Sequence, residues 1–204
     1  SFKLAKATFS SRAKMPVKLP SKSLWRTMKF NLEEALDLLA RTPALLNALL
    51  NGLSDSWTNK NEGPETWSPY DVVGHLVNAE KTNWLPRAKL ILDEGESRPF
   101  EPFDRFAMFE TSQGKTLQSL LEEFARLREQ NLQTLRQFKL TENDFEKVGH
   151  HPDLGEVTLK ELLATWVVHD LSHLRQIVRT MAKHYETEVG PWKAYLSILS
   201  ESQK

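Results

Sequence analysis

Three histidines carry the clearest chemistry in this sequence. His169 and His173 stand four residues apart in the segment His169-Asp-Leu-Ser-His173, and His75 lies far earlier in the chain. On an α-helix, residues i and i+4 share one face with Cβ atoms about 5–6 Å apart, so two imidazoles at this spacing can bind one ion. Three neutral ring nitrogens suit a divalent metal and leave a coordination position open for water or substrate.

The place of the histidine pair on its helix matters as much as its spacing. Steps of three and four residues define an apolar stripe that comprises Leu162, Trp166, His169, His173 and Ile177. Both rings are therefore predicted to point inward, where an unpaired polar group costs about 1–3 kcal/mol. A shared metal would satisfy both rings, and so would hydrogen bonds to neighbouring backbone or carboxylates. Spacing and placement alone leave these two interpretations open.

The elements that must position these histidines are helices. Apolar residues recur at helical spacing in long segments, whereas the alternating pattern of strands is hard to find. Predicted helices cover residues 31–51, 68–93, 116–138 and 158–184, and a short fifth helix follows Gly190-Pro191. His75 falls on the second helix and the pair on the fourth. The predicted fold class is all-α, a four-helix bundle with a short extra C-terminal helix.

Some local features refine this plan. Pro86 lies inside the second predicted helix, where its ring and missing N–H predict a kink or an end near Leu85. Trp166 and Trp192 are expected in the core. Trp67, beside a helix start, is expected to brace that start or to form part of a pocket wall.

Between the third and fourth helices the sequence predicts no regular structure. Leu154-Gly-Glu-Val157 is expected to turn the chain, and His150 and His151 are expected in a loop before Pro152. Adjacent loop residues rarely chelate one ion well, so this pair is interpreted as exposed or capping.

Outer-shell partners of the metal ligands are a further expectation. Ligand histidines usually donate their second ring N–H to a polar group, and the candidates are Asp170, Glu80 and Gln176. Asp170 lies about 100° around the helix from His169, so a bridge from Asp170 to a neighbouring helix is the alternative. Glu80 lies five residues beyond His75, and a place on the surface is the favoured interpretation for it. No general base is assigned.

The composition limits what else the chain can do. Its 204 residues are 40% hydrophobic and 26% charged, as in an ordinary globular domain, and the absence of cysteine restricts any metal to nitrogen or oxygen ligands. No apolar run reaches the roughly 20 residues of a membrane span, so no membrane is expected as a partner. Residues 1–29 hold eight Lys or Arg and no acid, which leaves 19 basic and 27 acidic residues elsewhere. This acidic body argues against nucleic acid as a partner.

The basic segment at residues 1–29 is interpreted as an N-terminal arm outside the domain, which is expected to span residues 30–200. The arm matches an organellar transit peptide only superficially, and it is either flexible or translated from upstream of a start at Met28. Without a secretory signal or cysteine, a cytoplasmic location is expected. A homodimer is compatible with a bundle of this size.

Four segments, at residues 37–46, 67–80, 154–173 and 189–196, carry a family resemblance. The second reads Trp67-Ser-Pro-Tyr-Asp-Val-Val-Gly-His75-Leu-Val-Asn-Ala-Glu80, and the third ends in His169-Asp-Leu-Ser-His173. The chain resembles the DinB/YfiT-like superfamily of metal-dependent enzymes over about residues 31–200. In that superfamily a four-helix bundle carries one histidine ligand on the second helix and two on the fourth. The resemblance implies His75, His169 and His173 as ligands of a divalent metal, with zinc or nickel as the first choices.

The resemblance also implies a class of chemistry. The superfamily includes thiol transferases, which add a low-molecular-weight thiol to a small electrophile, and metal hydrolysis is a neighbouring activity. The expected partners are a small-molecule substrate and a low-molecular-weight thiol. The alternative is a non-enzymatic binding or stress-response module in which the metal staples the bundle. A closed structural site would need a fourth protein ligand, and none stands at helical spacing from the three histidines, which favours the enzyme.

Overall fold

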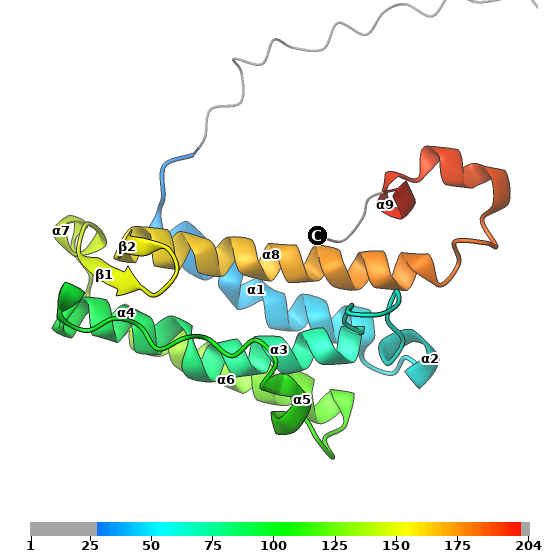
Figure 1. The fold of residues 1–204 in the computed structure, drawn as a ribbon, viewed down its shortest axis with the longest axis horizontal. Helices are drawn as coiled ribbons and strands as arrows, with labels where there is room; N and C mark the ends of the chain where they lie inside the picture. The colour runs from blue at the N-terminus through cyan, green and yellow to red at the C-terminus, as the bar shows by residue number, and fades with distance from the viewer. Residues whose placement is uncertain (1–27, 201–204) are drawn as a thin grey trace, which may run out of the picture.

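A computed structural model describes residues 28–200, so most of the predicted arm lies outside the described residues. The long helices run alongside one another (Figure 1) and are α1 (Leu32–Leu50), α3 (Pro69–Thr82), α4 (Trp84–Asp93), α6 (Leu117–Gln137) and α8 (Leu159–Lys183). Shorter elements connect them: α2 (Asp55–Thr58), η2 (Gly95–Ser97), α5 (Met108–Thr111), α7 (Glu142–Phe145), β1 (Val148–His151), β2 (Gly155–Thr158), η3 (Gly190–Tyr195) and α9 (Ser197–Ser200). The predicted all-α four-helix bundle is confirmed.

The starts of the long helical elements are set locally. At the starts of α1, α3, α6 and α8, a side chain accepts a hydrogen bond from a backbone N–H of the first turn, which is otherwise without a partner. These N-cap residues are Asn31, Ser68, Thr116 and Thr158. Asp71 and Glu161 return the bond in capping boxes at α3 and α8, the two helices that carry the histidines. The predicted helix starts are therefore confirmed.

The predicted second helix is divided into α3 and α4 at Asn83, three residues before Pro86. A proline ring collides with the carbonyl four residues earlier and offers no N–H to it, and that carbonyl here belongs to Thr82. The chain therefore breaks at Asn83, and Pro86 occupies the first turn of α4, where its missing N–H costs nothing. The predicted interruption of this helix is confirmed, but it lies at Asn83, two residues before the predicted position at Leu85.

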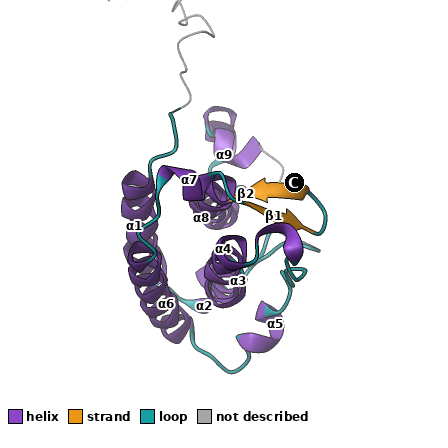
Figure 2. Ribbon diagram, turned by 90° about the vertical axis from the view of Figure 1, so that its left-hand side faces the viewer, coloured by secondary structure: helices purple, strands orange, loops and turns teal. Residues whose placement is uncertain are grey.

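The order of the helices around the bundle brings distant segments together. Each of α1 and α3 packs against both α6 and α8, so α1 and α3 lie diagonally opposite each other although they are consecutive long elements. Figure 2 shows this arrangement end-on, with α8 beside α3 and α4. This topology places His75 opposite His169 and His173.

The apolar core has two parts that are separated by polar side chains. One cluster includes Leu39, Trp84, Leu132 and Trp166. The other includes Leu46, Val73, Phe124 and Ile177. The buried polar residues between them are Thr42 of α1, Glu80 of α3, Arg128 of α6 and Asp170 of α8. The bundle is therefore built around an internal polar layer.

A β-hairpin was not predicted by the sequence. β1 and β2 pair antiparallel, with Val148 opposite Thr158 and His151 opposite Gly155. The strands have four residues each and contain glycine, so they lack the alternation that identifies a strand. Gly149 is required by packing, since a Cβ there would lie 2.7 Å from Ile91 and 3.0 Å from the Phe100 ring. The expectation that His150 and His151 lie in a loop is therefore wrong.

The C-terminal part differs in detail from the prediction. The short fifth helix is a 3-10 turn, η3, followed by the four-residue α9. Trp166 is buried as expected, but Trp192 is 71% exposed, so its predicted place in the core is wrong. Within residues 28–200, no helix combines the length and apolarity needed to cross a bilayer.

Candidate metal centre

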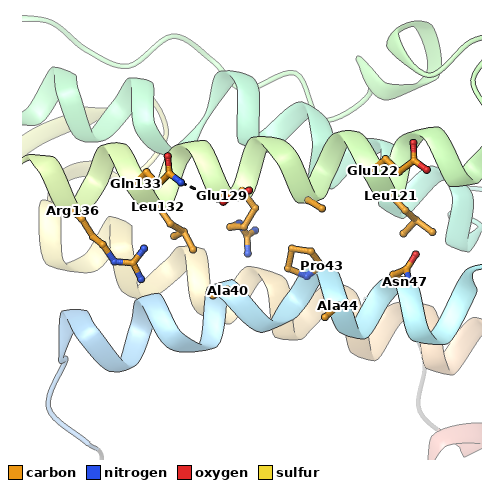
Figure 3. Close-up of a pocket in the computed structure, with 12 residues that line it drawn as sticks. Ala40, Pro43, Ala44, Asn47, Leu121, Glu122, Glu129, Leu132, Gln133 and Arg136 are labelled. Carbon is orange, nitrogen blue, oxygen red and sulfur yellow. Dashed lines mark hydrogen bonds between the residues drawn. The ribbon is translucent and has the colours of Figure 1, made fainter.

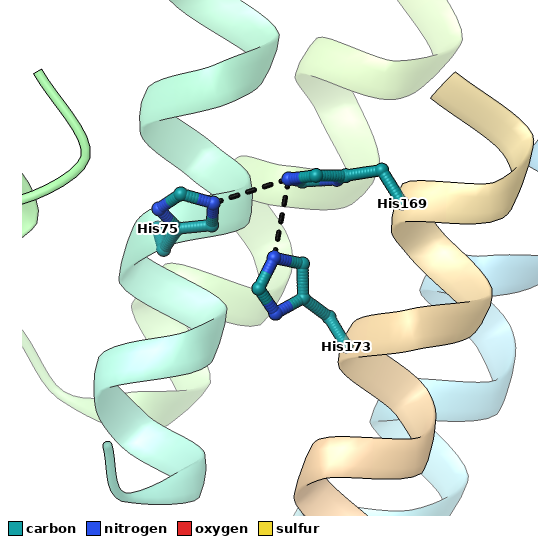
Figure 4. A group of neighbouring side chains, drawn as sticks. All are labelled: His75, His169 and His173. Atoms are coloured by element: carbon teal, nitrogen blue, oxygen red, sulfur yellow. Dashed lines mark hydrogen bonds between the residues drawn. The ribbon is translucent and has the colours of Figure 1, made fainter. Parts of the chain in front are cut away.

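The three histidines predicted as ligands meet between α3 and α8 (Figure 4). Their ring nitrogens converge, with Nε2 of His169 lying 3.1 Å from Nε2 of His75 and 3.1 Å from Nε2 of His173. One ligating atom from each ring falls within 4.8 Å of the other two. His75 is buried, and the two α8 histidines are half-buried. Within the described part of the chain, the cluster consists of these three side chains and includes no carboxylate.

The second nitrogens of two rings fix where their protons lie. Nδ1 of His75 donates to the Arg105 carbonyl oxygen at 3.3 Å, and Nδ1 of His173 donates to the Gln176 amide oxygen at 2.8 Å. A neutral imidazole carries one proton, so Nε2 of each ring is left with a free lone pair. Both lone pairs face Nε2 of His169, which can serve only one of them as a hydrogen-bond donor. Hydrogen bonding alone therefore does not satisfy this arrangement.

A single ion does satisfy it. Metal–nitrogen bonds of about 2.0–2.1 Å hold neighbouring ligand nitrogens roughly 2.9–3.4 Å apart, depending on whether the geometry is octahedral or tetrahedral. The two separations of 3.1 Å fall inside that interval. The residues present therefore fit a divalent metal with nitrogen ligands.

The surroundings keep these rings neutral. Burial, with the neighbouring His173 ring, lowers the pKa of His75 to about 4. Burial, with both neighbouring imidazoles, lowers the pKa of His169 to about 2, and burial also lowers the pKa of His173. All three rings are therefore unprotonated at neutral pH, as metal ligation requires.

Aromatic rings enclose the centre. The Trp67 ring lies 4.8 Å from the His75 ring and stacks on His173 at 6.1 Å, which confirms its expected place in a pocket wall. Phe103 meets His75 edge-on at 5.5 Å, and Trp84 meets His169 at 5.0 Å. These apolar faces exclude water from the rings and account for the depressed pKa values.

The comparisons with known proteins agree with this fold. Residues 19–177 match the sequence model of the DinB superfamily. The chain belongs to the DinB superfamily. A Bacillus pumilus protein named "Putative metal-dependent hydrolase" is 27% identical over 157 residues, which cover 76% of this chain and 88% of that protein. The solved structure of YfiT from Bacillus subtilis, described as a probable metal-dependent hydrolase with an unusual four-helix bundle topology, is 23% identical with a TM-score of 0.67. The matched region covers 78% of this chain and 91% of YfiT. At this level of identity, the similarity shows that the two proteins share a fold.

Two cavities of this DinB-superfamily protein border the histidine centre from different sides. A cavity of about 370 Å³ is lined by His173 together with Trp67, Arg105, Phe106 and Gln176. A second cavity, of about 240 Å³, is lined by His169 and by residues of α4, the loop before α5 and the hairpin. A groove of about 550 Å³ between α1 and α6 (Figure 3) is lined by none of the three histidines. The histidine centre therefore opens onto the first two cavities and not onto the groove between α1 and α6.

The candidates for outer-shell contacts divide into two groups. Gln176 contacts His173, as expected. Asp170 turns away from the centre to α6, where it pairs with Arg128 at 2.6 Å, so the bridge to a neighbouring helix is confirmed. Glu80 is buried and pairs with the same arginine at 2.8 Å, so its favoured place on the surface is wrong, as is the alternative contact with the site.

Arg128 is a buried charge that the sequence did not identify. It is 1% exposed and donates to both carboxylates and to the Leu39 carbonyl oxygen at 2.7 Å. That carbonyl is free because Pro43, four residues later in α1, has no N–H to offer it. Arg128 stands four residues from both Phe124 and Leu132 in an apolar stripe, and this placement was the sequence feature that could have identified it.

Proposed function

We propose that this protein is a metal-dependent enzyme in which His75, His169 and His173 hold one divalent ion and a small molecule takes the open coordination positions. The observation that carries the proposal is the convergence of two Nε2 lone pairs on the third Nε2 at equal separations of 3.1 Å. Zinc or nickel is the proposed ion, since imidazole suits both. The names of the relatives support metal dependence.

We further propose group transfer from a low-molecular-weight thiol to a small electrophile as the reaction. When bound, a divalent ion would supply a lowered pKa for a thiol or water and a polarising charge for an electrophile. Two cavities that reach the same centre from different sides suit two organic substrates. The buried carboxylates nearest in sequence, Glu80 and Asp170, are committed to Arg128 and are not placed to act as a general base.

The protein's own side chains would bind and shield the reactants. Trp67 and Phe106 would form apolar walls on the His173 side, while Gln176 holds the His173 ring in orientation. Water exclusion by these rings strengthens electrostatic contacts with the substrates. Hydrolysis is the second candidate reaction, because both relatives carry that name.

The first experiment measures metal content. Wild-type protein loaded with zinc or nickel and desalted should retain about one ion per chain, and His169→Ala should retain almost none while its helical circular dichroism is unchanged. His150→Ala, which removes an exposed histidine, is the matched control and should behave as wild type. Retention of the ion by His169→Ala would overturn the ligand assignment, and loss of its helical structure would indicate a structural metal.

The second experiment separates the two reactions. Metal-loaded protein is mixed with cysteine as the thiol and chlorodinitrobenzene as the electrophile, and thiol consumption is followed. Hydrolysis of a nitrophenyl ester is measured without thiol. Thiol consumption that requires the metal and His169 supports transfer. Ester hydrolysis with the same requirements, and no thiol consumption, supports the hydrolase instead.

A further inference from the structure

The cavity of about 240 Å³ beside His169, which we call the α4–α8 pocket, has walls of a distinct kind. Most of its lining is apolar and includes Trp84, Phe100, Phe103, Leu154 and Leu162. Its volume is below the roughly 300–1,000 Å³ of pockets for drug-sized ligands, so it fits a small molecule. The hairpin holds one wall in place, because the Phe100 N–H donates to the His150 carbonyl oxygen at 2.9 Å.

Arg87 gives this apolar pocket a positive charge. The residue is 9% exposed, and its guanidinium donates to the Glu101 carbonyl oxygen at 3.1 Å and lies over the Phe100 ring at 4.9 Å. No carboxylate among residues 28–200 lies within ion-pair distance of it. The buried Arg128 is paired with two carboxylates. A buried cation without a counter-ion is unfavourable, so Arg87 is placed to receive an anion from outside the chain.

His151 adds a neutral donor to the same pocket. Its Nδ1 accepts hydrogen bonds from the backbone N–H groups of Asp153 and Leu154, at 3.1 and 3.3 Å. The ring proton of neutral His151 therefore lies on Nε2. Burial and the nearby Arg87 charge lower the pKa of His151, so the ring is neutral when it donates.

Unpartnered buried atoms also concentrate here. Asn83 Oδ1, Trp84 Nε1 and His169 Nδ1 are buried without a hydrogen-bond partner, and all three residues line the α4–α8 pocket. Native proteins leave few buried polar atoms unsatisfied, so the hydrogen bonding behind this wall of the pocket is incomplete within the chain. The carboxylate of Glu161 does not compete for Arg87, because Glu161 is exposed and accepts hydrogen bonds from Thr158 in the capping box of α8.

We infer that the α4–α8 pocket binds a small carboxylic acid with an apolar body, whose carboxylate pairs with Arg87 and accepts from His151. Its body packs on the apolar wall formed by Trp84 and Phe100. Arg87 and His169 line the same pocket, so a small acid held by Arg87 lies beside the histidine centre. The carboxylate site itself does not depend on the proposed function. Only the role of the acid as the electrophilic substrate rests on that proposed function.

The test uses hexanoate and its neutral counterpart hexanamide as probes, titrated by calorimetry into metal-free and zinc-loaded protein at pH 7. Wild type should bind hexanoate at least about tenfold more tightly than hexanamide, with or without zinc. Arg87→Met should abolish this preference, and Arg87→Lys, which keeps the charge but not the forked geometry, should retain part of it. Arg98→Met, an exposed arginine near the same loop, should match wild type.

Equal binding of the two probes by wild type would overturn the inference, and this comparison needs no variant that must fold. Hexanoate binding that requires zinc and survives Arg87→Met would also overturn it, since the anion would then bind at the metal. If the protein holds no metal but Arg87 still selects hexanoate, the proposed enzyme function fails and the carboxylate site remains.

Discussion

Two buried polar clusters lie side by side in this bundle and are paired in opposite ways. In the Arg128 cluster the guanidinium meets Glu80, Asp170 and the Leu39 carbonyl, and Glu80 also accepts from Asn131 and Trp166. In the histidine centre, two Nε2 lone pairs face a third Nε2 that cannot serve both. In the first cluster both carboxylates are paired within the chain, although Arg128 Nε has no hydrogen-bond partner. In the second cluster a lone pair lacks a donor, and the proposed metal ion would accept it.

Adjacent residues of α8 separate the two clusters. His169 faces α3 and meets His75, while Asp170, about 100° further around the helix, faces α6 and meets Arg128. One helix therefore supplies both a residue of a buried ion pair and a proposed metal ligand, on different faces. The lone pairs that the chain leaves without a donor distinguish the histidine centre from the Arg128 cluster and mark it as the candidate site.

The largest expected effect tests the structural cluster. Arg128→Met leaves Glu80 and Asp170 buried without their cation and should lower the free energy of unfolding by about 3–5 kcal/mol. His75→Leu in metal-free protein removes a ring whose Nε2 lone pair competes with that of His173 for one donor. This change should lower the free energy of unfolding by no more than about 1 kcal/mol. Urea unfolding of both variants measures the difference.

Arg126→Met, an exposed change on the same helix, is the control and should shift stability by less than about 0.5 kcal/mol. A loss for Arg128→Met no larger than that for His75→Leu would contradict the contrast between the clusters.

The second expected effect is the acid sensitivity of the metal-free protein. The folded pKa of His75 is about 4, against an ordinary value of 6.5, so the unfolded chain binds more protons between these pH values. Stability should therefore be fully present above about pH 6.5 and fall as the pH approaches 4, with His75 contributing about 3 kcal/mol of that loss. Urea unfolding at several pH values measures the slope, which His75→Leu should reduce. An unchanged slope in that variant would refute the assignment to His75.

The sequence predicted what is decided locally. Capping residues such as Ser68 and Thr158 set helix starts because their hydrogen bonds reach only three residues along the chain. The helix faces placed His169 and His173 inward, and the family resemblance added His75 as their partner. The sequence could not assign partners to Arg128, since they come from three other helices, nor identify the Arg105 carbonyl beside His75, because every residue has one. The hairpin was missed because it depends on packing around Gly149.

A smaller effect is expected for the side chain that orients one ligand. Gln176→Leu removes the amide oxygen that accepts from His173 Nδ1 and should weaken metal affinity by about 10–100-fold, the usual effect of losing such a partner. Competition with a zinc chelator measures the affinity, and the exposed change Gln133→Leu serves as the control. Unaltered affinity in Gln176→Leu would mean that the ring is held by packing against Trp67 alone.

The smallest expected effect concerns Pro43 of α1, which leaves the Leu39 carbonyl oxygen free to accept from Arg128. Removing a proline from a helix interior ordinarily recovers up to about 3 kcal/mol, because a backbone hydrogen bond is regained. In Pro43→Ala the regained N–H would face the Leu39 carbonyl, which already accepts from Arg128 at 2.7 Å, so little new bonding is available. The unfolded chain also gains freedom when proline is lost, which costs about 0.4–1 kcal/mol. We therefore expect the free energy of unfolding, measured with urea, to stay within about 1 kcal/mol of the wild-type value.

A stabilisation near 3 kcal/mol would show that Arg128 does not replace the missing backbone bond, and the Arg128 cluster would then be less complete than its geometry indicates.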